Sequence, residues 1–323
     1  MLREIDRILP RSGGAPPDPA FLADVQSGFS ARQKSVPARW FYDHRGSQLF
    51  EAITRLPEYY PTRTERSILA ARAGEIAALV GPGRAVVEFG SGSSAKTPLL
   101  LRAVAPACYV PVDISGAFLR ESAAALGRSF PDLPIHPLEA DFLEPLSLPD
   151  GVAGAGALGF FPGSTIGNME ARDAVDLLRN MAATLGADAR LVIGIDRIKS
   201  PDILVPAYDD AQGVTAQFNL NLLARINREL AADIPIADFR HLVRWNDDAA
   251  RIEMHLEATR DLAFTVSGRR FAMRAGETIH TENSHKYGRR DAALLLRASG
   301  WTPLAEWTDA DDLFAVILAG AAD

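Results

Sequence analysis

The chain has 323 residues, of which 47% are hydrophobic and 23% are charged, and its formal net charge is -7. This is globular composition, so a disordered or fibrous protein is excluded, and the length predicts two domains or one enlarged domain. The acidic balance argues against a nucleic-acid-binding protein, which normally carries a basic surface. The single cysteine, Cys108, cannot form an internal disulfide, so a reducing compartment, the cytoplasm, is expected.

No segment has the pattern of a signal peptide or a membrane span. The N-terminus is charged early and lacks the apolar core of a signal peptide. The longest uncharged run, residues 151–169, holds six glycines and a proline. It predicts a loop that leads into a buried strand rather than a span of about 20 apolar residues, so we expect no membrane contact.

The first half of the chain predicts an α/β fold. Residues 1–30, rich in proline, glycine and alanine, are expected to be an irregular lead-in. After an aromatic stretch, Thr62 followed by Glu65 predicts a capping box at the start of a helix. Short apolar strands separated by helical segments then predict a parallel sheet with helices on both faces. These strands are expected near residues 85–89, 107–112, 135–139, 157–161 and 190–195.

The alternation breaks after Asp196. Apolar residues spaced by four predict a long helix from Val214 to Leu230, and RIEMHLEAT alternates as a half-exposed antiparallel strand does. LAFTVS and RFAMR predict a hairpin, and a helix and two strands end the chain. We therefore expect one domain of residues 62–195 and 287–323. An inserted α+β domain of residues 196–286, joined by residues 31–61, is expected to bind the substrate.

A glycine loop suggests a nucleotide site. VEFGSGSSAK places Gly90 and Gly92 between a strand and a helix, and with Ala95 they match the G-x-G-x-x-G/A fingerprint. Asp113 lies 23 residues after Gly90 at the end of the next strand, where a carboxylate can accept hydrogen bonds from ribose hydroxyls.

A second carboxylate, Asp141, ends the following strand beside Phe142, and the two could hold an adenine amine and ring. Acidic residues at successive strand ends resemble class I S-adenosylmethionine-dependent methyltransferases more than dehydrogenases. Both aspartates could instead be ordinary helix N-caps.

Several blocks of the sequence resemble the L-histidine Nα-methyltransferases of ergothioneine biosynthesis. They are KSVPARWFYD, GSQLFEAITRLPEYYPTRTE, VEFGSGSSAKT, GSTIGN, AYDDAQGVTAQFNLNLLARINREL and TENSHKY. The resemblance implies a class I methyltransferase, Rossmann-like sheet plus a domain specific to the family. It also implies that S-adenosylmethionine donates three methyl groups in succession to the α-amine of L-histidine, giving hercynine. We expect a monomer. We also expect no metal, because the histidines form no metal-binding motif.

The resemblance also implies site residues. Cofactor contacts are expected at Gly90, Lys96, Asp113, Asp141 and Phe142. Histidine contacts are expected at Tyr59, Asn168, Tyr208, Met254, Glu282, Asn283 and Ser284. The expected catalytic residues are Tyr42, Tyr59 and Asn168. Asn283 and His285 depart from the family pattern, which has apolar or small residues there.

The chemistry of these side chains suits histidine. In extended structure Glu282 and Ser284 project to one side while Asn283 points away. The carboxylate can accept from an imidazole N–H, and the hydroxyl can donate to or accept from the other nitrogen. Tyr208 can donate to the substrate carboxylate. A solvated surface glutamate and serine would give the same pattern.

The α-amine is expected to lie between Tyr59 and Asn168, with Tyr42 relaying its proton through water. Methyl transfer needs a deprotonated amine held in line, so positioning should supply most of the acceleration. Asn168 could instead cap a helix, and Tyr59 could simply pack in the core. Three other functions stay open: an N-methyltransferase for tryptophan-type substrates, a nicotinamide-dependent dehydrogenase and a non-catalytic cofactor-binding module.

Overall fold

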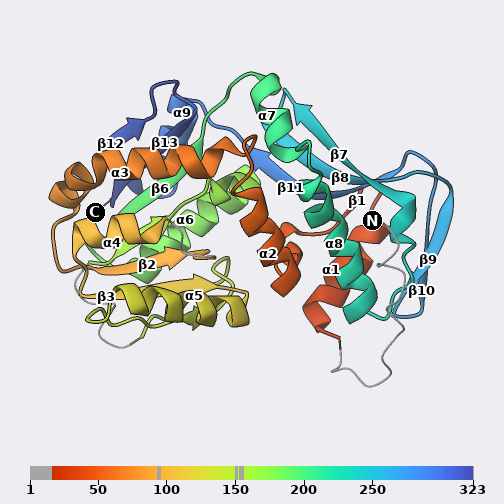
Figure 1. Ribbon diagram of the computed structural model, residues 1–323, viewed down its shortest axis with the longest axis horizontal. Helices are drawn as coiled ribbons and strands as arrows, with labels where there is room; N and C mark the ends of the chain where they lie inside the picture. Colours follow the sequence, from red (N-terminus) through yellow and green to blue (C-terminus); the bar gives the residue numbers. More distant parts are fainter. Residues whose placement is uncertain (1–16, 93–95, 150–151, 153–155, 323) are drawn as a thin grey trace.

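The computed structural model describes residues 17–92, 96–149, 152 and 156–322, which form two parts side by side (Figure 1). One part is built on a seven-stranded sheet, and the other on a four-stranded sheet with a separate two-stranded hairpin. Within the described ranges, no helix is both long and apolar enough to cross a membrane.

The seven-stranded sheet confirms the expected α/β class. Its five parallel strands are followed at one edge by an antiparallel pair. In spatial order the strands are β12 (Trp301–Thr308), β13 (Phe314–Ala321), β6 (Arg190–Asp196), β5 (Leu158–Phe161), β2 (Ala85–Phe89), β3 (Cys108–Asp113) and β4 (Leu138–Glu139). The strand expected at 135–139 is shorter than predicted, since only β4 and one bridge from Ile135 to Tyr109 pair there.

Helices cover both faces of this sheet (Figure 1). Successive strand residues alternate between the faces, so Val86 packs under one helical layer and Val87 under the other. The layer on the Val86 side contains α3 (Tyr60–Val80), α4 (Thr97–Val104) and α5 (Gly116–Ser129). The opposite layer contains α6 (Ala171–Leu185) and α9 (Arg289–Ala298).

The second part has a core of its own, lined by aromatic and aliphatic side chains from both ends of its sequence. Its sheet has the order β1 (Lys34–Ser35), β11 (Thr278–His285), β8 (Arg251–Ala258) and β7 (Phe239–Asn246). The predicted hairpin pairs β9 (Leu262–Val266) with β10 (Arg269–Met273). The helices are α1 (Pro19–Ser30), η1 (Ala38–Phe41), α2 (His44–Ile53), α7 (Pro201–Tyr208), α8 (Val214–Glu229) and η3 (Ile236–Asp238).

Helix α1 corrects the expectation that residues 1–30 are irregular. Asp18 caps it by accepting from the N–H groups of Ala20 and Phe21, and Phe21, Val25 and Phe29 are buried at helical spacing. The proline-rich composition of the preceding segment hid this amphipathic pattern. Residues 1–16 of the predicted lead-in lie outside the described part of the chain.

The predicted capping box is also wrong. Helix α3 begins at Tyr60, so Thr62 lies inside it and makes no cap. Glu65 is fully buried; its carboxylate contacts the Lys96 ammonium and accepts the N–H of Gly163 at 2.9 Å. The glutamate therefore links α3 to two loops at the strand ends instead of reaching back to its own helix.

The two sheets meet at the buried Asp196, the last residue of β6. Its carboxylate lies 2.7 Å from the Lys286 ammonium and 2.6 Å from that of Lys199, and Tyr60 donates to it at 2.8 Å. Its carbonyl accepts the N–H of Tyr287, just beyond β11. Burial alone would raise the pKa of Asp196, but the two ammonium groups lower it below its ordinary value.

Replacing Asp196 by asparagine should therefore lower the free energy of unfolding by about 3–5 kcal/mol, because it leaves buried ammonium groups without a counter-charge. Urea denaturation measures this. Glu139→Gln, which removes an exposed ion pair with Arg120, is the control and should cost about 1 kcal/mol or less. Equal costs for the two variants would contradict the role of Asp196 as the junction.

Candidate active site

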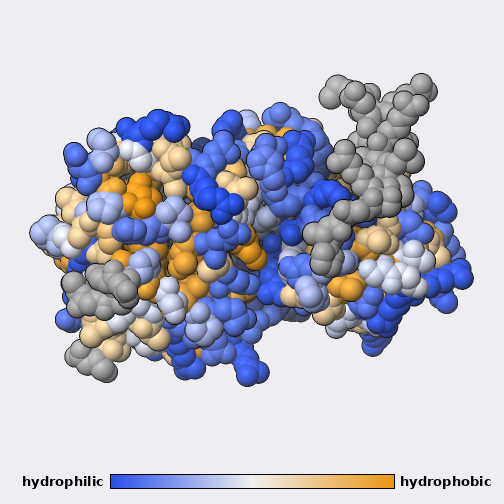
Figure 2. All heavy atoms as spheres, turned by 90° about the horizontal axis from the view of Figure 1, so that it is seen from below, coloured by the Kyte–Doolittle hydropathy of each residue, from blue (hydrophilic) through white to orange (hydrophobic). Residues whose placement is uncertain are grey.

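A cavity of about 680 Å³ lies between the two parts, within the range of small-molecule sites. Seen from below, the molecular surface is hollowed between the two halves (Figure 2). The cavity wall combines loops at the carboxyl ends of the parallel strands with η1, α2 and strand β11. Ligands of open α/β sheets bind at these strand ends, so both parts of the chain contribute to one site.

The glycine loop forms one end of the cavity. Gly90 and Gly92 follow β2 with φ +71° and +49°, a backbone conformation that favours glycine. A Cβ on Gly90 would lie 3.2 Å from the Phe142 ring, so the close approach of ring and backbone also requires glycine. Lys96 lines the cavity beyond the loop, whereas Ala95, the third fingerprint position, lies outside the described residues.

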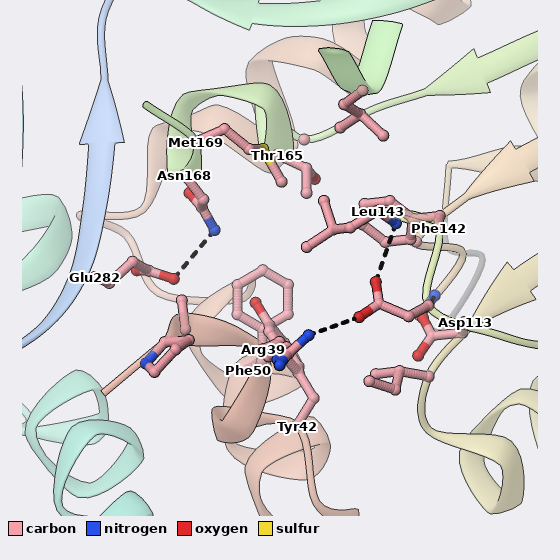
Figure 3. A pocket seen from close by; sticks show the side chains of 18 of the residues that line it. Arg39, Tyr42, Phe50, Asp113, Phe142, Leu143, Thr165, Asn168, Met169 and Glu282 are labelled. Carbon is pink, nitrogen blue, oxygen red and sulfur yellow. Dashed lines mark hydrogen bonds and ion pairs between the residues drawn. The ribbon is translucent and has the colours of Figure 1, made fainter. Parts of the chain in front are cut away.

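The two strand-end aspartates, Asp113 and Asp141, line this same end. Figure 3 shows Asp113 near Phe142. Asp113 accepts the N–H of Gly92 and of Ser115, each at 2.9 Å, which fixes the carboxylate beside the glycine loop. Asp141 accepts the N–H of Leu143 at 3.0 Å and a hydrogen bond from Arg39 at 3.2 Å. The structure thus brings the predicted nucleotide-type residues together.

Arg39 was not singled out in the sequence. It lies in η1 and forms ion pairs with both Asp141 and Asp24 of α1, so it connects the glycine-loop end of the cavity to the second part. Nothing in the spacing of a lone arginine within an aromatic stretch indicates such a role.

The opposite end of the cavity contains Asn168 and Glu282. The Asn168 side chain donates to Glu282 Oε1 at 3.1 Å (Figure 3). Asn168 ends η2 (Thr165–Asn168), and a Cβ on Gly167 would lie 2.7 Å from the carbonyl oxygen of His285. Glycine at 167 therefore lets the turn press against β11, which brings the amide to the glutamate.

Glu282 lies at the cavity wall, largely shielded from solvent. Desolvation raises its pKa to about 8, although Lys286 acts in the opposite direction. The carboxyl group is therefore largely protonated near neutral pH in the free protein. When a ligand brings a hydrogen-bond donor into the cavity, Glu282 can release its proton and accept the hydrogen bond as a carboxylate.

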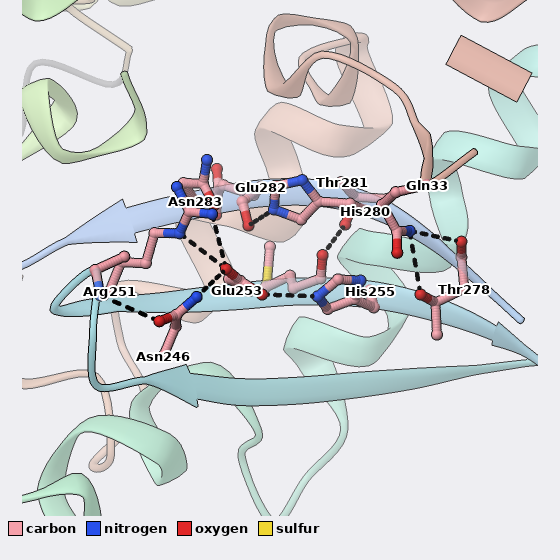
Figure 4. A network of polar contacts seen from close by, with 12 residues as sticks. Gln33, Asn246, Arg251, Glu253, His255, Thr278, His280, Thr281, Glu282 and Asn283 are labelled. Atoms are coloured by element: carbon pink, nitrogen blue, oxygen red, sulfur yellow. Dashed lines mark hydrogen bonds and ion pairs between the residues drawn. The ribbon is translucent and has the colours of Figure 1, made fainter. Parts of the chain in front are cut away.

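A network on β8 and β11 holds this part of the wall (Figure 4). Thr281 donates to the carbonyl of Met254, and the His280 ring contacts the carbonyl of Glu282 at 3.1 Å. Burial would raise the pKa of Glu253, but hydrogen bonds from Asn246 and other neighbours lower it to about 2. The Thr281 contact holds β11 against β8.

Strand β11 departs from the simple alternation of side chains between its two faces. A register shift between His280 and Glu282 lets residues 280–283 all line the cavity. Asn283, predicted to point away from Glu282, is thus a lining residue, and its amide donates to Glu170 at 2.9 Å.

Three expected substrate contacts lie behind the cavity wall. Met254 is buried in the core and pairs across the sheet with Glu282. Tyr208 and Ser284 are hydrogen-bonded to each other at 2.7 Å and do not line the cavity. Lys286 donates to both hydroxyls, so they are held by other residues of the chain. Contact of Tyr208, Met254 and Ser284 with a substrate stays a prediction.

Tyr42 and Tyr59, the predicted catalytic tyrosines, both line the cavity. The Tyr59 ring packs edge to face against Phe50 and Tyr208, with centroids 6.3 and 6.2 Å away. Burial, together with Glu282 and the neighbouring tyrosines, raises the pKa of Tyr42 and of Tyr59 well above the ordinary value. Both phenols stay protonated and act as hydrogen-bonding groups rather than as bases.

Comparison with known proteins identifies the family. The family model for S-adenosylmethionine-dependent, histidine-specific methyltransferases matches residues 21–321. Histidine N-alpha-methyltransferases from Mycolicibacterium smegmatis and Mycobacterium tuberculosis are 42% and 40% identical, over 93% of this chain and 94% of each relative. Ergothioneine biosynthesis protein 1 of Neurospora crassa is 30% identical over 85% of this chain, which spans 32% of that longer protein. The chain therefore belongs to the histidine-specific, S-adenosylmethionine-dependent methyltransferases.

Proposed function

We propose that the chain transfers three methyl groups in succession from S-adenosylmethionine to the α-amine of L-histidine, giving hercynine. One observation carries this proposal: a single cavity joins the strand-end carboxylates Asp113 and Asp141 to the Asn168–Glu282 pair. Membership of the family sets the dehydrogenase alternative aside.

The glycine-loop end fits the methyl donor. Each Asp113 oxygen accepts one backbone N–H, which leaves lone pairs for the two hydroxyls of a ribose. The Phe142 ring beside Asp141 offers an aromatic face to an adenine, and the positive-φ glycines let a ligand approach the backbone closely. Bound there, S-adenosylmethionine supplies an activated methyl group on a sulfonium.

The middle of the cavity suits an amine that becomes a fixed cation. Asn168 and Tyr59 can accept or donate to orient the amine lone pair, and Tyr42 can pass the released proton to water. Neutral phenols tolerate the loss of N–H donors as methyl groups accumulate. The aromatic faces of Phe50 and Tyr59 attract the growing cation, so successive products can remain in the site.

The far end suits an imidazole. Glu282 can accept from a ring N–H, while Asn168 holds the other edge of the carboxylate. An apolar side chain would leave these groups unpaired, which disfavours it by on the order of 10⁴-fold. Glu282 therefore favours histidine over leucine or phenylalanine. The indole N–H of a tryptophan-type substrate could also meet Glu282, but the matching family model is histidine-specific, so such a substrate is the weaker candidate.

Calorimetry on protein saturated with S-adenosylhomocysteine should show histidine binding much more tightly than tryptophan. Glu282→Gln should weaken histidine binding about tenfold or more, because a charged acceptor is lost, while leaving S-adenosylhomocysteine binding nearly unchanged. Asp113→Asn is the matched control and should do the converse. Tighter binding of tryptophan, or equal losses of both ligands in both variants, would overturn the assignment.

The raised pKa of Glu282 predicts a pH dependence. Below pH about 8 the Glu282 carboxyl group of the ligand-free protein is protonated, so it must release its proton before it accepts an imidazole N–H as a carboxylate. Above that pH the group is already ionised, so histidine binding no longer includes this unfavourable step. The ratio of wild-type to Glu282→Gln histidine affinity should therefore rise as pH increases through about 8. Taking the ratio cancels the titration of histidine itself. A ratio that is flat with pH would show that the ionised carboxylate is not the acceptor.

A further inference from the structure

A fully buried ammonium group lies directly behind the cavity wall. The Lys286 side chain is 0% exposed, and its nitrogen lies 2.7 Å from the Asp196 carboxylate. The same nitrogen donates to the hydroxyls of Tyr208 and Ser284, each at 2.8 Å. An ammonium has three N–H donors, so all of them are used. Two of them end on residues that the family resemblance connects with the substrate.

The Tyr208–Ser284 hydroxyl pair has one proton with which it can donate a hydrogen bond to a ligand. Tyr208 and Ser284 share one hydrogen bond, and each also accepts from Lys286. Whichever hydroxyl donates to the other, one proton of the pair is left over. A phenol is the stronger donor, so a nearby anion favours the order in which Ser284 donates to Tyr208 and Tyr208 donates to the ligand.

The pair lies next to the cavity. Tyr208 packs against Tyr59, which lines the cavity, and Ser284 directly follows the lining residues Glu282 and Asn283. Tyr208 is 8% exposed, so its side chain is not completely sealed in the core. A ligand that reaches the leftover proton is held best if it presents an acceptor atom there.

The charge around Lys286 is not balanced. Asp196 is shared with Lys199, whose pKa is lowered to about 8 by burial and so remains mainly protonated at neutral pH. Two ammonium groups thus contact one carboxylate, and Asp309 acts only on Lys199, without direct contact. Glu282, largely protonated in the free protein, does not cancel the excess. A positive charge in such a poorly solvated place attracts an anion much more strongly than it would in water.

We propose that Lys286 is a positioning residue that selects substrates with an α-carboxylate, acting through the Tyr208–Ser284 hydroxyl pair. The inference rests on the proposed function, since it requires histidine in the cavity. The buried ammonium orients the Tyr208 proton towards the carboxylate and supplies its counter-charge.

The test compares L-histidine with histamine, which has the same imidazole and amine but no carboxylate. Calorimetry uses full-length wild type, Lys286→Met, Tyr208→Phe and the double variant, each saturated with S-adenosylhomocysteine. Lys286→Met should weaken histidine binding about tenfold or more and change histamine binding by about twofold or less. Because both residues act on one carboxylate, the double variant should be little weaker than Lys286→Met alone.

Equal losses for histidine and histamine, or fully additive losses in the double variant, would overturn the inference and leave Lys286 with a structural role only. Thermal stabilisation by S-adenosylhomocysteine checks that each variant is folded. If Lys286→Met does not fold, Tyr208→Phe decides alone, since an equal loss of both ligands there overturns the inference as well. Wild type that fails to bind histidine would refute the proposed function instead.

Discussion

The buried carboxylate of Asp196 is the contact on which the rest of the site depends. It ends the central strand β6, carries two ammonium groups and is tied through its carbonyl to the end of β11. Because β11 is fixed there, its residue Glu282 meets Asn168 from the loop after β5. The cavity between the two sheets is thus a consequence of how they are joined.

The site divides its tasks between the two parts of the chain. The strand ends of the seven-stranded sheet supply the carboxylates and the glycine loop, where nucleotide-type ligands bind in such sheets. The second part supplies neutral aromatic groups and the wall of β11. The tyrosines stay protonated and the glutamate has a raised pKa, so these groups are better suited to binding and orienting a substrate than to removing its protons. This suits a reaction accelerated by positioning.

Much of this could be predicted from the sequence, because the features are local. Strands buried on both faces are short apolar runs. Asp113 ends one of them, β3, and Asp141 comes just after the short edge strand β4. The junction could not be predicted in this way. Asp196, Lys199 and Lys286 look like ordinary charged residues, and their burial depends on segments that meet only in the folded chain.

The same limit explains the errors. Glu65 matched a local capping pattern, yet a distant ammonium and a loop N–H bind its carboxylate. Ser284 keeps the alternation expected of a strand, but its hydrogen bonds to Tyr208 and Lys286 arise only in the folded chain and could not be predicted from the sequence.

Mass spectrometry of L-histidine incubated with the protein and S-adenosylmethionine tests the central claim most directly. The account predicts products with one, two and finally three added methyl groups, all placed on the α-amine by fragmentation. Methyl groups on the imidazole ring, or methylation of tryptophan in preference to histidine, would contradict it.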